Sequence, residues 1–136
     1  MGEGQGTTAN SDRHPRDTAT AILGHRYPSL RVRYWGDARR SAWILEEIGK
    51  EKPITVGLVV NGQNIEQVRV LAFRESRGWE VRYPFFTDQF ANARLTDNER
   101  LDRSIDGITG ATLSVGAVTR IARVALLMHE HVTDAG

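Results

Sequence analysis

The chain has 136 residues, 40% hydrophobic and 26% charged, so it is long enough for one globular domain with a modest core. Its formal net charge of +1 gives no reason to expect nucleic acid or an anionic membrane as a partner. The absence of cysteine excludes disulfides, thiol catalysis and iron–sulfur clusters held by cysteine.

The first part of the chain is weakly patterned. Residues 1–17 are polar and without periodicity, which predicts a disordered tail, and we expect the domain itself to span 18–136. Residues 18–23 are predicted to form a short helix that ends at Gly24. Residues 30–34 alternate apolar and basic side chains, as a half-exposed strand does.

Residues 38–48 are predicted to form a helix. Asp37 has the short acceptor side chain that favours an N-cap, and Gly49 suits the end of the helix. Residues at helical spacing form a broad apolar face: Ala38, Ala42, Leu45 and Ile48.

A β-hairpin follows. Residues 54–60 and 65–73 are rich in β-branched side chains, and Asn61-Gly62 between them is a strong hairpin signal. The hairpin places 73–79, Phe-Arg-Glu-Ser-Arg-Gly-Trp, at a strand end, where its arginines could contact a phosphate bidentately. The alternative is a solvated charged turn.

The rest of the chain is predicted to be a short helix, a polar loop and a long helix. Pro84 opens the helix over 85–91, and 93–104 is the loop. The last helix runs from Ser114 to His131 with an apolar inner face: Val115, Val118, Ile121, Ala122, Ala125, Leu126 and His129. Arg120 and Arg123 are expected to point outward. These elements predict an α+β fold, a small antiparallel sheet with packed helices.

The stretch Asp106 to Thr112 (Asp-Gly-Ile-Thr-Gly-Ala-Thr) is a two-glycine turn that leads directly into the last helix. The first N–H groups of a helix lack intrahelical partners and its dipole is positive there, so such a loop suits a phosphate. A threonine at its rim could carry that phosphate as an ester. The alternative is a capped turn with Thr112 or Ser114 as N-cap.

These residues resemble the attachment motif of the FMN-binding domain family, which includes the covalent-flavin subunits of the sodium-pumping NADH:quinone reductase and the Rnf electron-transport complex. In that family a flavin transferase esterifies the last threonine of the motif with FMN, using FAD as donor. The matching position is Thr112. Glu75 and Gly78 match a second feature of the family, a glutamate followed shortly by glycine after a hairpin. The chain departs from the family where Ser114 alone remains of a hydroxyl pair, and where Thr109 replaces a common serine.

The resemblance implies FMN as cofactor and Thr112 as its covalent site. Asp106 is expected to fix the loop by accepting backbone N–H bonds, and Thr109 and Ser114 to donate to the phosphate. Trp79, Phe85 and Phe86 are candidates for contact with the flavin ring, whereas Trp35 and Trp43 are interpreted as core. The expected cofactor-binding residues are Thr112, Asp106, Gly107, Thr109, Gly110, Ala111, Leu113, Ser114, Glu75, Gly78 and Trp79.

The same resemblance implies an extracytoplasmic electron carrier, with an export signal or membrane anchor removed from the sequence. Its implied partners are an FAD- and Mg²⁺-dependent flavin transferase and membrane or periplasmic redox proteins. We expect a redox carrier rather than a self-contained enzyme, because no acid–base or nucleophile constellation is visible in the sequence. Two alternatives remain: a module that holds flavin or another phosphate ligand noncovalently, and a structural interaction domain without a cofactor.

Overall fold

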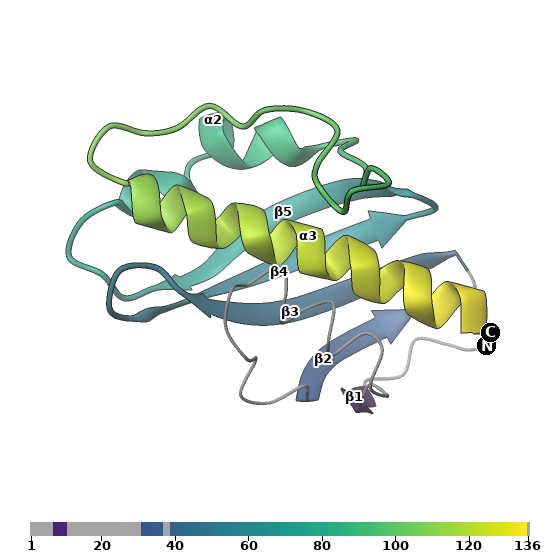
Figure 1. The fold of residues 1–136 in the computed structure, drawn as a ribbon. Helices are drawn as coiled ribbons and strands as arrows, with labels where there is room; N and C mark the ends of the chain where they lie inside the picture. Colours follow the sequence, from purple (N-terminus) through teal and green to yellow (C-terminus); the bar gives the residue numbers. More distant parts are fainter. Residues whose placement is uncertain (1–6, 11–30, 37–38, 136) are drawn as a thin grey trace.

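The computed structural model describes residues 7–10, 31–36 and 39–135, and Figure 1 shows how their elements are arranged. Within these residues five strands form one sheet: β1 (Thr7–Asn10), β2 (Arg31–Gly36), β3 (Arg40–Ile48), β4 (Pro53–Asn61) and β5 (Asn64–Phe73). The helical segments are the 3₁₀-helix η1 (Trp79–Arg82), α2 (Pro84–Thr87), the 3₁₀-helix η2 (Asp88–Phe90) and α3 (Thr112–Ala135). Each strand is antiparallel to the next, so the predicted α+β class is confirmed.

Predictions for the start of the chain fall mostly outside the described residues. The short helix over 18–23 lies wholly outside them. Of the disordered tail predicted over 1–17, residues 7–10 form β1 and pair with β2 instead, while the rest lies outside. The strand predicted over 30–34 is found as β2.

The hairpin of β4 and β5 is confirmed. Along β4 every second side chain is buried, as in a strand with one face on the core. The two-residue loop is Gly62-Gln63, one residue later than predicted, between the paired residues Asn61 and Asn64. Gly62 has φ 67°, the positive value that a type II′ hairpin turn requires at its first central position.

The helix predicted over 38–48 was wrong, because residues 40–48 form β3 at the centre of the sheet. Four alternate side chains of β3 are buried: Ser41, Trp43, Leu45 and Glu47. Two of them are polar, so the sequence lacks the apolar alternation of a strand, and the remaining apolar residues imitate helical spacing. Ile48, assigned to the apolar helix face, is 45% exposed. The expected N-cap Asp37 lies outside the described residues.

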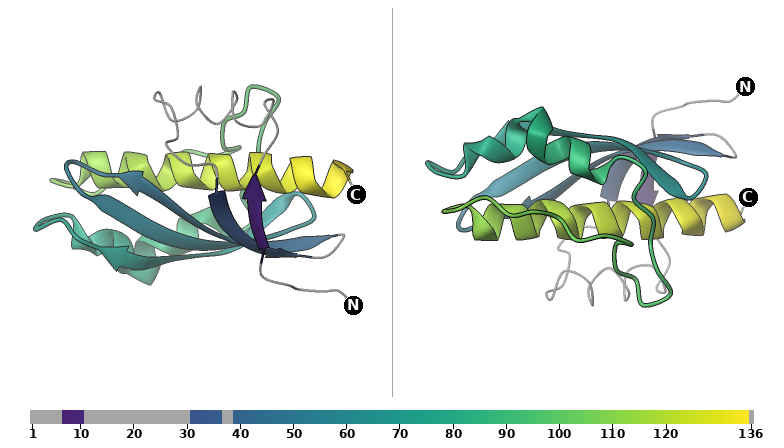
Figure 2. Two further views of the ribbon diagram at one scale, coloured as in Figure 1. Left: turned by 90° about the horizontal axis from the view of Figure 1, so that it is seen from below. Right: turned by 90° about the horizontal axis from the view of Figure 1, so that it is seen from above.

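Helix α3 lies across one face of the sheet, and the main core fills the space between the two layers (Figures 1 and 2). It begins at Thr112, two residues earlier than predicted, and its predicted inner face is confirmed. Val118 and Ile121 are fully buried there, against β4 residues such as Val56 and Val60 in the same core cluster. Full burial of each such side chain is worth about 1.5–3 kcal/mol, and it fixes where α3 begins relative to the sheet.

A polar network crosses this core between β3 and α3. The Oγ of Ser41 lies 2.6 Å from Nδ1 of His129, and Nε1 of Trp43 donates to the same oxygen at 2.6 Å. The Nε2 of His129 lies 2.8 Å from the carbonyl oxygen of Gly62. Because a carbonyl only accepts, this nitrogen carries a proton. The network binds the hairpin turn to the far part of α3, and Trp43 is confirmed as a core residue.

The arginines of α3 do not point freely outward, so that prediction was wrong. The Nε of Arg120 lies 3.1 Å from Oε2 of the buried Glu47 on β3. The Nε of Arg123 donates to the carbonyl oxygen of Glu99 at 2.7 Å. Both side chains therefore tie α3 to neighbouring segments.

The short helices lie beside β5 at the edge of the sheet (Figure 1). The helix predicted over 85–91 is found as α2 followed by η2, with Pro84 at its first turn. Phe86 and Phe90 are buried with their rings 5.5 Å apart, edge to face. Residues 91–111 then form a loop, as predicted for 93–104, and its last part runs back alongside α3 to the start of that helix (Figure 2).

Candidate functional site

The first turn of α3 keeps its backbone donors free. The first helical hydrogen bond runs from the N–H of Val115 to the carbonyl of Ala111 at 2.9 Å, so Ala111 holds the N-cap position. The N–H groups of Thr112, Leu113 and Ser114 have no hydrogen-bond partner among the described residues. Because alanine cannot cap, the helix forgoes about 1 kcal/mol that a Ser or Asp would supply there. Thr112 and Ser114 lie inside the helix, so the capped-turn alternative was wrong.

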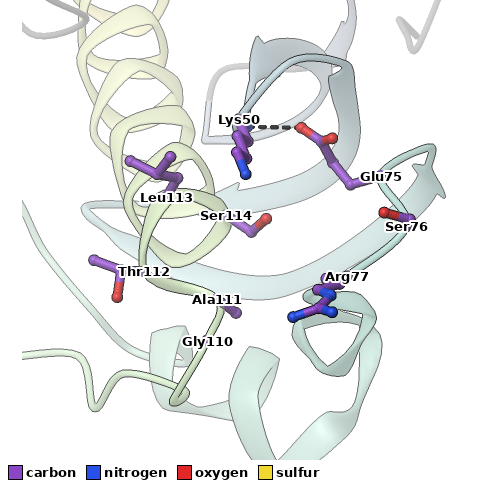
Figure 3. Close-up of a pocket in the computed structure, with 9 residues that line it drawn as sticks. All are labelled: Lys50, Glu75, Ser76, Arg77, Gly110, Ala111, Thr112, Leu113 and Ser114. Carbon is purple, nitrogen blue, oxygen red and sulfur yellow. Dashed lines mark hydrogen bonds between the residues drawn. The ribbon is translucent and has the colours of Figure 1, made fainter.

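A pocket of about 280 Å³ opens at this helix start (Figure 3). Three segments meet there: the turn after β3, the loop after β5, and the motif loop (residues 106–111) with the first turn of α3. The lining residues are Lys50, Glu75, Ser76, Arg77, Gly110, Ala111, Thr112, Leu113 and Ser114. The structure thus brings together Glu75 and the second half of the predicted motif, which are far apart in the sequence.

The pocket carries unpaired positive charge. Lys50 and Arg77 line it, both are exposed, and neither side chain has an ion pair or hydrogen bond among the described residues. Figure 3 shows the Arg77 guanidinium lying near Ala111 and the start of α3. Together with the free N–H groups, these cations make the pocket a site for an anion. Sequence reasoning did not single out Lys50, because only the fold brings the turn after β3 to α3.

Glu75 is occupied by the turn next to it. Its Oε2 accepts backbone N–H bonds from Lys50 at 2.7 Å, Glu51 at 2.6 Å and Lys52 at 3.0 Å. These hydrogen bonds, those from Lys52 and Glu51 most strongly, hold the pKa of Glu75 below its usual value of 4.5. Glu75 therefore positions the turn that carries Lys50.

The side chain of Ser114 lies between two glycines, Gly49 and Gly78, each of which adjoins a pocket-lining residue in the chain. Its side chain is almost fully buried, at 4% exposure, and its hydroxyl has no hydrogen-bond partner among the described residues. A Cβ on Gly78 would lie 3.1 Å from the Ser114 oxygen, and a Cβ on Gly49 would lie 3.3 Å from it. Both distances are tighter than ordinary van der Waals contact, and at Gly78 the φ of 90° favours glycine as well. A buried hydroxyl without a partner is uncommon and suits a site whose ligand supplies the partner.

The conformation of the motif loop (residues 106–111) depends on Gly110 and on a hydrogen-bonding side chain, Gln89, that the sequence did not single out. Gly110 has φ 83°, a value that favours glycine. The Asp106 carboxylate makes no hydrogen bond among the described residues, so its expected role was wrong. Instead Gln89 clamps the backbone: its Oε1 accepts the Asp106 N–H at 2.7 Å and its Nε2 donates to the Asp106 carbonyl at 3.2 Å. Gly107 and Thr109 lie outside the pocket lining.

Exposed aromatic rings follow Gly78 in the chain. Trp79 and Tyr83 meet edge to face with centroids 5.2 Å apart, and Tyr83 and Phe85 do so at 5.9 Å. Trp79 is 47% and Phe85 59% exposed, so both remain candidates for ring contact. Phe86 is buried in the core, and its assignment to the ring was wrong. The side chain of Trp35 lies outside what the structure describes.

Free backbone donors at a helix start and two unpaired cations suit the phosphate of a ligand, and exposed aromatic rings follow the same pocket loop in the chain. A family model described as "FMN-binding domain" matches residues 49–127, which is more than half of the chain and includes the whole pocket. The chain belongs to this family, and FMN is its cofactor. No curated protein matches the chain.

The residues of the pocket fit FMN. Its phosphate suits the three free N–H groups, the unpaired Arg77 and Lys50 and the orphan hydroxyl of Ser114. In the part of the chain that the structure describes, no helix is both long and apolar enough to cross a bilayer.

Proposed function

We propose that the chain carries FMN covalently, as a phosphoester on Thr112, and serves as an electron carrier. The observation that carries the proposal is the placement of Thr112. It is exposed, it is the first residue of α3, and it lies next to free backbone donors and unpaired cations. A hydroxyl in that place is accessible to a modifying enzyme, and its product would be stabilised where it forms.

Attachment would make one phosphoester bond and break one phosphoanhydride bond. The Thr112 oxygen bonds to the FMN phosphorus of FAD and gives up its proton, and AMP leaves with the electron pair of the broken P–O bond. This chemistry requires the FAD- and Mg²⁺-dependent flavin transferase. The chain itself supplies an accessible hydroxyl on a loop that Gly110 and the Gln89 clamp hold in shape.

After attachment the phosphate would keep one negative charge, which the chain's own groups would stabilise. The N–H groups of residues 112–114 would donate to it, and the guanidinium of Arg77 would offer charge-assisted hydrogen bonds. Trp79 and Phe85 provide exposed faces for the ring, and the FMN supplies the redox chemistry.

We further propose that the protein works outside the cytoplasm, between membrane or periplasmic redox partners. Leu113 lines the pocket, and Trp79 and Phe85 follow the pocket residue Arg77 in the chain; the exposed apolar side chains of all three support a transient docking face around the cofactor. A chain directed to the cytoplasm alone should stay free of flavin, while an exported chain should acquire it. Flavin fluorescence of the purified protein in a denaturing gel measures the difference.

The intact mass after co-expression with a flavin transferase tests the attachment. We expect a gain of one FMN less one water that survives denaturation, is absent in Thr112→Ala and is kept in Thr112→Ser. Thr109→Ala is the matched control, because it removes a hydroxyl of the same loop that lies outside the pocket lining. Flavin that stays attached to Thr112→Ala would contradict the proposal.

A second candidate is noncovalent binding of FMN in the same pocket. It is favoured by Ser114, Arg77 and Lys50, which suit a phosphate whether or not it is esterified. In that case a chain exposed to an active transferase gains no mass, yet binds free FMN that denaturation releases. Arg77→Gln should then weaken FMN binding by about tenfold, the value of one charge-assisted hydrogen bond.

A further inference from the structure

A second cavity lies along α3, separate from the pocket at the start of that helix (hereafter the flavin pocket). It measures about 610 Å³ and is an open groove between the loop after η2 and the middle of α3. Its lining residues are Arg100, Leu101, Asp102, Arg103, Ser104, Ile105, Thr119 and Arg123. None of them lines the first pocket. The volume is that of a site for a small organic molecule rather than for a single inorganic ion.

The loop that forms one wall is a built structure. Leu95 pairs with Leu101, and the N–H of Thr96 donates to the carbonyl of Arg100 at 2.7 Å. Glu99 adopts φ 62°, a left-handed conformation that costs a non-glycine residue energy. Its carbonyl accepts the Nε bond of Arg123. The Glu99 carbonyl thus fixes the Nε side of the Arg123 guanidinium. The two Nη atoms of Arg123 make no hydrogen bond among the described residues and are available to a ligand.

The charges of the groove do not balance. Each guanidinium nitrogen of Arg103 donates one hydrogen bond: to the Asp102 carboxylate at 3.0 Å and to the carbonyl oxygens of Ala91 and Asn92 at 2.9 and 3.0 Å. Asp102 and Arg103 therefore neutralise each other. Arg100 and Arg123 have no ion pair among the described residues, so two unpaired cations line the groove, with Glu99 as the nearby opposite charge.

Arg123 is the more constrained of the two. Burial lowers its pKa most, the charges of Arg100 and Arg120 lower it further, and the nearby charge of Glu99 raises it. A half-buried guanidinium beside a like charge is stabilised when an anion lies between the two.

We propose that this groove binds a small organic dianion, a phosphate monoester or a dicarboxylate, between Arg100 and Arg123. The planar forks of the two arginines suit the oxygens of either group. Leu101 and Ile105 offer an apolar wall to the ligand's carbon body. This inference does not rest on covalent flavin, because it uses none of the residues of the first pocket.

The ligand would share one side of α3 with the attachment site. Thr119 and Arg123 follow Thr112 by seven and eleven residues, a spacing that returns to the same helix face. At 1.5 Å per residue they lie about 10 and 16 Å from Thr112 along the axis. A bound dianion would therefore lie on the same side of α3 as Thr112.

Calorimetric titration of the whole chain with succinate and with phenyl phosphate tests the proposal. We expect saturable one-to-one binding of at least one of the two, and the one that binds identifies the anionic group. Arg100→Gln should weaken that binding about tenfold or more, and Arg123→Gln at least as much. The side chain of Arg100 is exposed and makes no hydrogen bond or ion pair among the described residues, so its variant should fold normally. Neutral succinamide should not bind.

Two matched variants separate this groove from other cationic sites. Arg69→Gln removes an exposed arginine of β5 whose side chain makes no hydrogen bond or ion pair among the described residues and lies outside both pockets, and it should leave binding unchanged. Arg77→Gln removes the cation of the flavin pocket and should also leave it unchanged. Binding lost in Arg77→Gln but kept in Arg100→Gln would overturn the proposal. So would the absence of saturable binding for both dianions.

Discussion

Replacing Gly78 by alanine tests how tightly the loop after β5 is packed against the start of α3. Gly78 has φ 90° and ψ 13°, a left-handed conformation that costs an L-residue about 1–2 kcal/mol. The new Cβ would lie 3.1 Å from the oxygen of Ser114 and 3.3 Å from the Cβ of Ala111. Overpacking of this kind costs about 1–3 kcal/mol. We therefore expect Gly78→Ala to lower the free energy of unfolding by about 2–5 kcal/mol.

Gly62→Ala separates the two contributions. Gly62 also has a positive φ, 67°, but the nearest atom to its Cβ would be Nη2 of Arg39 at 4.0 Å. Only the backbone cost of about 1–2 kcal/mol applies there. Urea unfolding measures both variants through the midpoint, provided that the slope m stays constant. The excess loss in Gly78→Ala is then the cost of the contact.

A double variant identifies the atom responsible. Ser114→Ala removes the oxygen at 3.1 Å, so it should recover about 0.5–3 kcal/mol in the Gly78→Ala background beyond its effect alone. The same change should show no coupling with Gly62→Ala. Equal losses for the two glycine variants, or additivity of Gly78→Ala with Ser114→Ala, would refute the packing argument.

The remaining predictions concern the free groups of the site. Ser114→Ala removes a buried hydroxyl without a partner, so it should raise the free energy of unfolding of the flavin-free chain by about 1 kcal/mol, as measured by thermal unfolding. A lower free energy of unfolding would mean that the hydroxyl does have a hydrogen-bond partner. The lowered pKa of Glu75 means that its hydrogen bonds stabilise the fold above pH 4.5 and are lost as pH falls through the lower folded value. The difference in Tm between wild type and Glu75→Gln should therefore shrink below pH 4.5, and a constant difference would contradict this reading. Gln89→Ala should cost about 1–2 kcal/mol for two hydrogen bonds and should raise amide exchange at Asp106; unchanged exchange there would exclude the clamp. Inorganic phosphate at ten times its dissociation constant should stabilise the flavin-free chain by about 1.4 kcal/mol, and Arg77→Gln should remove that gain if the pocket is the anion site.

The part of the fold that could be predicted from the sequence depends on local signals. The hairpin of β4 and β5 has its turn glycine and its alternation, and α3 has an apolar face of helical period. β3 could not be read in the same way. Its inward-facing Ser41 and Glu47 are satisfied by His129 and Arg120, which lie 88 and 73 residues later in the chain. A buried polar residue with a distant partner looks like a surface residue when only its neighbours are known.

The candidate site shows the same division. The loop that ends at Thr112 could be found from its residues, because glycines, hydroxyls and a following helix lie side by side in the sequence. Lys50 and Gln89 could not, because only the fold brings them to that loop. Glu75 could be singled out from the sequence, but its structural role could not be predicted. The three N–H groups that donate hydrogen bonds to it belong to a turn more than 20 residues earlier in the chain.

The free groups at the start of α3 all favour the same ligand. An alanine at the N-cap, a buried hydroxyl without a partner and two unpaired cations each leave the empty chain less stable than a capped, satisfied and neutral helix start would be. One phosphate relieves all of them at once. Substitutions that satisfy these groups within the protein should raise the stability of the flavin-free chain. They should also weaken FMN binding, because the phosphate would no longer find unpaired groups to satisfy. Thr112 lies at the edge of this site and remains exposed, which is where a group must be if another enzyme is to join the phosphate to it.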